Sequence, residues 1–221
     1  MSVRFTKIDN LTRGQHRFLD DGDDCSFIGE FTARKGYAHS ETNSKIISFK
    51  MKPSIRLENG YRYRHKGHAI EYWARHLASA MPASEAAKAI WVPIPGSCPR
   101  GDPEYDDRLL RVVNRAYSNR IHVAELLVQV GNRAAAHDSS QRPTPDTLIE
   151  NWNTDFQVLP SGSYNFIIFD DVLTRGASFK AAKKILMEQY PGSAVSGVFL
   201  ARTVHDDGPM FDFDALPGSD E

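Results

Sequence analysis

The sequence predicts an α/β protein built on a doubly wound parallel sheet, with a small β-rich extension at the N-terminus. Short apolar runs of strand length at 89–92, 165–169 and 194–201 alternate with stretches of helical periodicity. Strands that alternate with helices favour a parallel sheet, because each crossover helix returns the chain to the same end of the sheet. At 221 residues, the chain is long enough for one such domain with additions.

The N-terminal half carries the first expected strands and the first expected helix. Residues 27–31 and 45–49 are short apolar segments that predict strands, and 89–92 predicts a buried strand. Between them, residues 67–81 place apolar side chains three and four positions apart, which predicts an amphipathic helix. Pro82 ends this helix, because proline lacks the N–H that would continue the hydrogen-bond pattern.

The middle of the chain is less regular. A second amphipathic helix is expected over 105–117, whereas 121–130 is apolar and leaves strand and helix open. Residues 132–145 are polar and predict a long loop, of the kind that often carries function. At its end, Thr144 is placed to cap a short helix with Pro145 at the first position.

The C-terminal part completes the pattern. Residues 165–169 predict a buried strand, 178–190 a helix stopped by Pro191, and 194–201 the last strand. Ligands of such sheets bind beyond the carboxyl ends of the strands. Three segments are therefore expected at that edge of the sheet: 93–97, 170–178 and 202–205.

The composition narrows the classes of function. The formal net charge of −1 gives no global field that would favour nucleic acid, and no apolar run reaches the length of a membrane span. Two cysteines, Cys25 and Cys98, cannot build a zinc ribbon alone, and no spacing predicts a metal cluster. We expect a cytoplasmic protein without a membrane partner, and the sequence leaves open whether it forms a homodimer.

The most informative stretch is residues 166–178, where four apolar residues lead into Asp170 and Asp171 and then into a loop of small residues. This loop opens into the predicted helix. Backbone N–H groups and the helix dipole bind phosphate at such an N-terminus. Neighbouring carboxylates accept hydrogen bonds from hydroxyl groups. The stretch therefore predicts a sugar-phosphate site, and an ordinary strand–turn–helix with a polar turn is the alternative.

This stretch resembles the phosphoribosyl-pyrophosphate (PRPP) binding signature of type I phosphoribosyltransferases, in which an apolar strand, an acidic pair and a Thr/Gly/Thr-like loop follow one another. Weaker similarities to the ComF-like branch of that family extend over residues 45–204, at 45–50, 91–95, 141–151 and 200–203. The chain also departs from that branch. It lacks the four-cysteine zinc ribbon, 105–109 differs from the usual helix start, and Arg175 replaces a small loop residue.

The resemblance implies a sheet of the type I phosphoribosyltransferase kind. It divides the chain into an N-terminal extension or hood (1–66), a phosphoribosyltransferase-like domain (67–205) and a C-terminal tail (206–221). It implies binding of PRPP or a nucleoside 5′-monophosphate and transfer of ribose 5-phosphate to a nitrogenous base, with release of pyrophosphate. Mg²⁺ would arrive bound to the substrate phosphates. Two alternatives stay open: a non-catalytic nucleotide-sensing module, and a ComF-like accessory protein in DNA uptake or phage defence.

The resemblance also implies roles for individual residues. Asp170 and Asp171 would hold the ribose hydroxyls and stabilise positive charge on the ring in the transition state. The 5′-phosphate would lie on Thr174, Arg175, Gly176, Ala177 and Ser178, with the Arg175 side chain pointing away from it. Pyrophosphate would lie on Ile94, Pro95, Gly96 and Ser97. Further charge would come from Arg108, Arg133, His137 and Arg142. The base would face Arg202 and Thr203.

Overall fold

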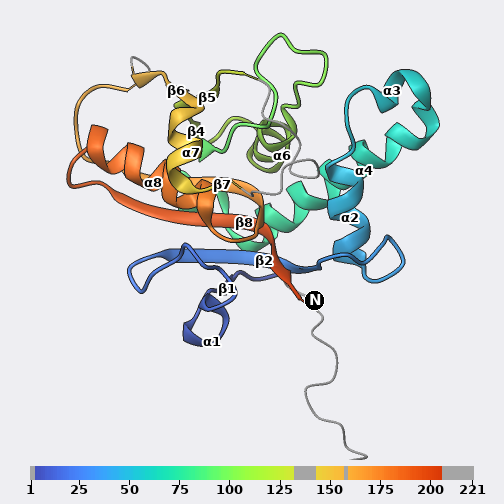
Figure 1. The fold of residues 1–221 in the computed structure, drawn as a ribbon, viewed down its shortest axis with the longest axis horizontal. Helices are drawn as coiled ribbons and strands as arrows, with labels where there is room; N and C mark the ends of the chain where they lie inside the picture. The colour runs from blue at the N-terminus through green and yellow to red at the C-terminus, as the bar shows by residue number, and fades with distance from the viewer. Residues whose placement is uncertain (1–2, 132–142, 157–158, 206–221) are drawn as a thin grey trace, which may run out of the picture.

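The computed structural model describes residues 3–131, 143–156 and 159–205, and its centre is a six-stranded sheet in the order β1-β2-β8-β7-β3-β4 (Figure 1). The strands are β1 (Thr6–Lys7), β2 (Asp24–Thr32), β3 (Ile90–Pro93), β4 (His122–Val123), β7 (Asn165–Leu173) and β8 (Ala194–Val204). β1 is antiparallel to β2, and every other pair of neighbours in this sheet is parallel. The prediction of an α/β protein with a mostly parallel sheet is confirmed.

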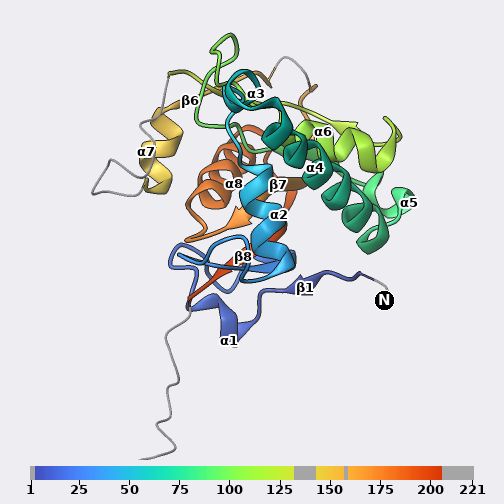
Figure 2. The same ribbon diagram turned by 90° about the vertical axis from the view of Figure 1, so that its right-hand side faces the viewer.

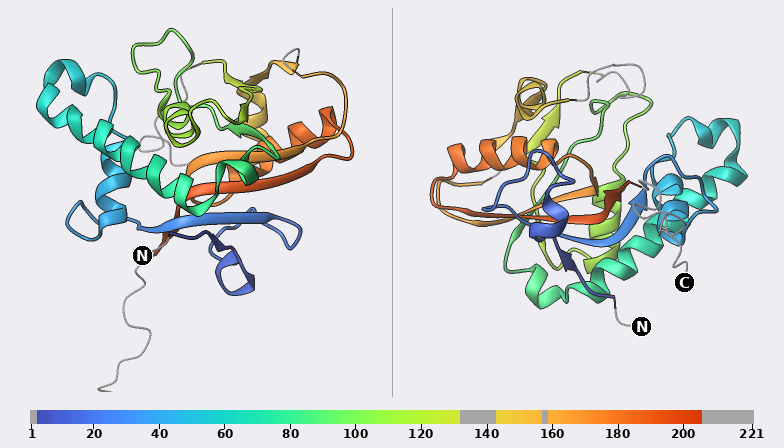
Figure 3. Two further views of the ribbon diagram at one scale, coloured as in Figure 1. Left: turned by 180° about the vertical axis from the view of Figure 1, so that it is seen from behind. Right: turned by 60° about the horizontal axis from the view of Figure 1, so that its bottom comes forward.

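Helices cover both faces of this sheet (Figures 1 and 2). One face carries α2 (Glu41–Phe49), α4 (Gly60–Ala80) and α6 (Arg108–Tyr117), and the other carries α7 (Pro145–Glu150) and α8 (Ala177–Gln189). Figure 3 shows α4 crossing its face of the sheet. The shorter elements are α1 (Asn10–Arg13), α3 (Ile55–Glu58), α5 (Ala83–Ala86) and an antiparallel pair, β5 (Leu127–Gln129) with β6 (Trp152–Thr154). This arrangement is compatible with a doubly wound fold.

The two faces of the sheet have separate hydrophobic cores, and β7 contributes to both. Phe166 and Ile168 belong to the core under α8, whereas Ile167 and Phe169 belong to the core under α2, α4 and α6. All four side chains are buried. A strand buried on both faces appears in the sequence as a continuous apolar run, which is why this strand could be predicted.

Most of the expected elements are confirmed. The strands expected at 27–31, 89–92, 165–169 and 194–201 correspond to β2, β3, β7 and β8. The helices expected at 67–81, 105–117 and 178–190 correspond to α4, α6 and α8. The apolar segment 121–130, whose pattern fits either strand or helix, contains two short strands, β4 and β5. Thr144 caps α7 as predicted, and most of the loop expected before it lies outside the described residues.

The strand expected at 45–49 is wrong, because this segment is the second half of α2. The Ser40 hydroxyl accepts a hydrogen bond from the Asn43 N–H at 3.0 Å and so begins the helix. Ile46 and Phe49, three residues apart, then lie on one buried face, in the core that α4 also lines. A segment of five residues such as 45–49 fits both the strand and the helix periodicity, and burial against α4 selects the helix.

The N-terminal residues contribute strands to the main sheet. β2 pairs in parallel with β8 from Asp24 opposite Ser196 to Thr32 opposite Val204, so it belongs to the main sheet. The boundary expected at residue 66 falls inside α4. An unpaired β8 would expose a row of N–H and C=O groups, and β2 satisfies them. The N-terminal part of the chain therefore completes the sheet that carries the candidate site.

Candidate functional site

The carboxyl ends of β3 and β7 lie side by side at one edge of the sheet. Pro93 is opposite Phe169, and the Ile94 N–H donates a hydrogen bond to the Phe169 carbonyl at 2.9 Å. A pocket that is partly open to solvent lies beyond these ends, and its empty volume, including solvent at its mouth, is about 590 Å³. Five of the predicted site residues line it: Ile94, Pro95, Gly96, Arg108 and Asp170.

Of the two acids at the end of β7, Asp170 lines this pocket and Asp171 does not, and Asp170 is half-buried. Its Oδ1 accepts a hydrogen bond from the Asp171 N–H at 2.7 Å. Burial raises the pKa of Asp170 to about 7, and the charge of Asp171 acts in the same direction. The raised pKa favours the protonated carboxyl group, which can donate a hydrogen bond to a hydroxyl as well as accept one.

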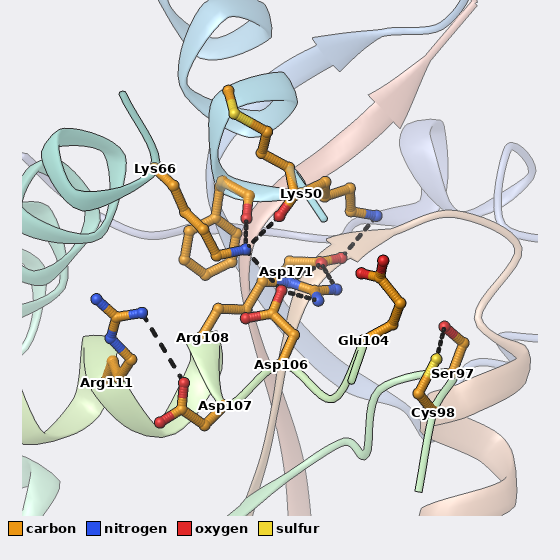
Figure 4. Close-up of polar contacts among 12 residues, drawn as sticks. Lys50, Lys66, Ser97, Cys98, Glu104, Asp106, Asp107, Arg108, Arg111 and Asp171 are labelled. Atoms are coloured by element: carbon orange, nitrogen blue, oxygen red, sulfur yellow. Dashed lines mark hydrogen bonds and ion pairs between the residues drawn. The ribbon is translucent and has the colours of Figure 1, made fainter. Parts of the chain in front are cut away.

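Asp171 is buried, and cations occupy both of its carboxylate oxygens. Lys50 Nζ lies 2.9 Å from Oδ1, and an Arg108 guanidinium nitrogen lies 2.7 Å from Oδ2 (Figure 4). Burial acts to raise the pKa of Asp171, but Lys50 and Arg108 outweigh it and hold the pKa well below its usual range. Asp171 is thus a fixed negative charge.

A deeper ion pair holds Arg108 in place (Figure 4). Lys66 is fully buried, and its Nζ donates to Asp106 Oδ2 at 2.6 Å and to the carbonyls of Phe49 and Met51 at 2.9 and 2.7 Å. The same Asp106 oxygen accepts a hydrogen bond from Arg108 at 2.9 Å. A row of alternating charges therefore runs from the core to the edge of the sheet.

The turn between β7 and α8 contains the predicted 5′-phosphate loop, residues 174–178. Gly176 is the residue before α8 and has a φ of +84°, in the left-handed region that favours glycine. Among the described residues, no side chain caps α8. The first N–H groups of a helix have no partner within it, and together with the helix dipole they suit an anion.

Arg175, the residue that departs from the family pattern, lies against the N-terminal part of the chain. Its guanidinium carbon is 5.1 Å from the centre of the Phe18 ring, a distance at which cation and ring attract each other. Thr174 is exposed, whereas Gly176 and Ala177 are buried. The loop is thus packed on one side by another segment.

The structure does not bring all predicted residues into the pocket. Arg202 is buried, and it donates to Glu30 Oε1 at 3.0 Å and to Gln15 Oε1 at 2.6 Å, so its side chain belongs to an internal network. Thr203 is buried as well, and Ser97 is not part of the pocket lining. Three residues predicted to add charge lie outside the described residues: Arg133, His137 and Arg142.

Several residues of the site had no assigned role in the sequence analysis. Lys50 lies at the end of the segment 45–50, and Asp106 lies within the segment 105–109, but the sequence assigns neither side chain a role. Lys66 ends a run of mostly basic residues, 62–66, yet its amine is in the core. No local pattern distinguishes it from its exposed neighbours, because its burial depends on the carbonyl groups at the end of α2.

Comparison with models of known protein families gives no match, and comparison with curated proteins gives none either. Among the described residues, no three His, Cys, Asp or Glu side chains are grouped so that they could hold a metal ion. None of the described helices is long and apolar enough to cross a membrane.

Proposed function

We propose that this protein binds PRPP or a nucleoside 5′-monophosphate at the carboxyl edge of its sheet and acts as a phosphoribosyltransferase. The observation that carries the proposal is the set of groups that meet at the carboxyl end of β7. There, a titratable carboxyl group faces a pocket, and a glycine turn and an uncapped helix N-terminus follow in the same chain. A ribose phosphate presents hydroxyl groups, which suit the carboxyl group, and a phosphate, which suits the helix N-terminus.

In this proposal the 5′-phosphate lies at the N-terminus of α8, and the ribose hydroxyls face Asp170. Pyrophosphate lies in the pocket, against the peptide groups of 94–96 and the guanidinium of Arg108. The family resemblance implies Mg²⁺, and Asp170 offers it one carboxyl group in the pocket. This set fits a metal held mainly by substrate phosphates and water, which is the usual state of Mg²⁺ beside phosphates.

The proposed reaction moves ribose 5-phosphate from PRPP to a nitrogen of a base, and pyrophosphate leaves with the bonding electrons. Positive charge develops on the ribose ring as that bond breaks. A carboxylate beside the ring stabilises this charge. The charge of Asp171 is already compensated by Lys50 and Arg108, so Asp170 is the acid whose ionisation would affect the rate.

A non-catalytic nucleotide-sensing module is the second candidate. The observation that favours it is the ion pairing of Asp171, which leaves Asp170 as the only member of the acidic pair that lines the pocket. Such a module would bind the same ligands without releasing pyrophosphate.

The test is to measure PRPP binding by calorimetry in the presence of Mg²⁺, and pyrophosphate release with a panel of purine and pyrimidine bases. The matched pair of variants is Asp170→Asn and Asp24→Asn, since Asp24 lies at the amino end of β2, at the opposite edge of the sheet. We expect Asp170→Asn to lower turnover more than binding, and Asp24→Asn to change neither. Binding without pyrophosphate release would favour the sensing module. Absence of PRPP binding at millimolar concentration would contradict both.

A further inference from the structure

A short N-terminal segment, residues 16–19, packs against the turn between β7 and α8, and we refer to it as the clasp. The His16 ring is fully buried, and its Nδ1 hydrogen-bonds to the Thr174 carbonyl. The Phe18 N–H donates to the Arg175 carbonyl at 2.9 Å. The clasp thus holds two consecutive carbonyl groups of the candidate phosphate loop.

These two hydrogen bonds fix the directions of the loop N–H groups. In a planar trans peptide, the carbonyl of one residue and the N–H of the next point in opposite directions, and the described residues contain no cis peptide bond. The Thr174 carbonyl points toward His16, so the Arg175 N–H points away from the clasp. By the same argument, the Gly176 N–H points away from Phe18. Two donors are thereby presented on the side of the loop opposite the clasp.

A third N–H is directed by α8 itself. The Gly176 carbonyl accepts a hydrogen bond from the Lys180 N–H at 3.0 Å, so it points along the helix. The Ala177 N–H therefore points out of the N-terminus of α8. The left-handed conformation of Gly176 lets the chain turn between these two sets of peptide groups.

Side-chain contacts hold the clasp on the loop. A Cβ atom on Gly176 would lie 2.8 Å from Leu19 Cδ2, so the backbone at Gly176 is in close contact with the Leu19 side chain. Beyond the clasp, Lys180 of α8 pairs with Asp20 and Asp23 at 2.6 and 2.9 Å. Arg175 stacks on Phe18 and so lies on the clasp side, away from the presented N–H groups.

We propose that His16 is a positioning residue for the 5′-phosphate: through the Thr174 carbonyl, it aims the loop N–H groups at the phosphate. The proposal rests on the proposed function and adds a residue to that site. A carbonyl oxygen only accepts hydrogen bonds, so Nδ1 of His16 carries the hydrogen and Nε2 is the bare nitrogen. Nε2 is buried without a hydrogen-bond partner among the described residues, which favours this neutral form.

The test compares three variants with ribose 5-phosphate as the probe, measured by calorimetry. His16→Leu keeps the volume and removes the donor, whereas His16→Asn keeps a donor at the place of Nδ1. His39→Leu is the matched control, because His39 hydrogen-bonds to Thr32 away from the loop. We expect His16→Leu to weaken ribose 5-phosphate binding about five- to tenfold, as for one lost hydrogen bond, and His16→Asn to restore most of it. His39→Leu should leave affinity unchanged.

Two further measurements separate positioning from general destabilisation. Binding of Mg²⁺-pyrophosphate, which does not need the loop, should be the same in wild type and His16→Leu. The NMR order parameters of the Arg175 and Gly176 amides should fall in His16→Leu and recover in His16→Asn. Unchanged order parameters, or equal losses for both probes, would overturn the proposal. If wild type binds no ribose 5-phosphate, the proposed function fails, and the phosphate role of His16 fails with it.

Discussion

The two neighbouring carboxyl groups at the end of β7 lie in opposite surroundings. Asp171 is buried between Lys50 and Arg108, and its pKa is held below the usual range. Asp170 faces the pocket, and burial raises its pKa to about 7. Successive side chains of a strand point to opposite faces of the sheet, so adjacent residues lie in different electrostatic fields. An acidic pair in a sequence therefore does not mean two equivalent acids.

This difference divides the site into a closed side and an open side. The closed side is the row of charges from Lys66 through Asp106 and Arg108 to Asp171, which holds the sheet edge together. The open side is the pocket that Asp170 lines, and Asp106 and Arg108 lie at the boundary because they line it as well. The loop 174–178, which follows β7, lies outside the pocket lining. We expect substitutions on the closed side to affect stability most and substitutions on the open side to affect binding most.

The largest effect is expected for Lys66→Met on the closed side. This change leaves Asp106 as a buried charge with one cation fewer and leaves two carbonyls unsatisfied, which should cost about 3–5 kcal/mol of unfolding free energy. Urea denaturation measures this loss of unfolding free energy. Lys88→Met is the control, because Lys88 forms an exposed pair with Glu85 that should contribute about 0–1 kcal/mol. Similar small losses in both variants would mean that the closed side is not held by a buried charge.

The next largest effect on stability should distinguish Asp171 from Asp170. Asp171→Asn removes the partner of Lys50 and Arg108, and we expect a loss of about 2 kcal/mol, below the value for fully buried pairs because both cations keep some contact with water. Asp170→Asn should leave the free energy of unfolding at pH 7 unchanged or raise it, since burial disfavours its charged form. Equal losses in the two variants would remove the distinction between the closed and open sides.

The pH dependence of stability offers a finer test of the open side. The folded protein keeps the proton on Asp170 up to about pH 7, whereas the unfolded chain loses it near the model value of 3.8. The unfolding free energy of wild type, relative to Asp170→Asn, should therefore be highest below about pH 4. It should fall as the pH rises to about 7, by at most about 1.4 kcal/mol per pH unit. A flat difference across this range would show that the pKa of Asp170 is not raised.

The smallest effect is expected for Arg175→Ala. The side chain stacks on Phe18, so its removal should cost about 0.5–1 kcal/mol of stability. Ribose 5-phosphate affinity should change less than about fivefold, because the charge does not contact the ligand. A larger loss of affinity, measured by calorimetry, would place Arg175 on the phosphate and would contradict the direction inferred for the loop.

The sequence predicted the fold class and most of the elements because their patterns are local. β7 was predictable from four consecutive apolar residues, and α4 from apolar side chains at helical spacing. The segment 45–49 was too short to distinguish strand from helix. The place of β2 was not predictable, since the choice of a strand partner depends on which edge of the sheet remains unpaired.

For the candidate site, the order of strand, acids, small-residue loop and helix is a property of consecutive residues, and the sequence alone determined it. Only the tertiary structure decided that Asp170 faces a pocket while Asp171 faces two cations, and that Lys66 lies in the core. The contact between His16 and Thr174 joins residues 158 positions apart. Such contacts depend on how whole elements pack. The burial of a side chain and the electrostatic field that acts on it come from residues that are distant in the chain.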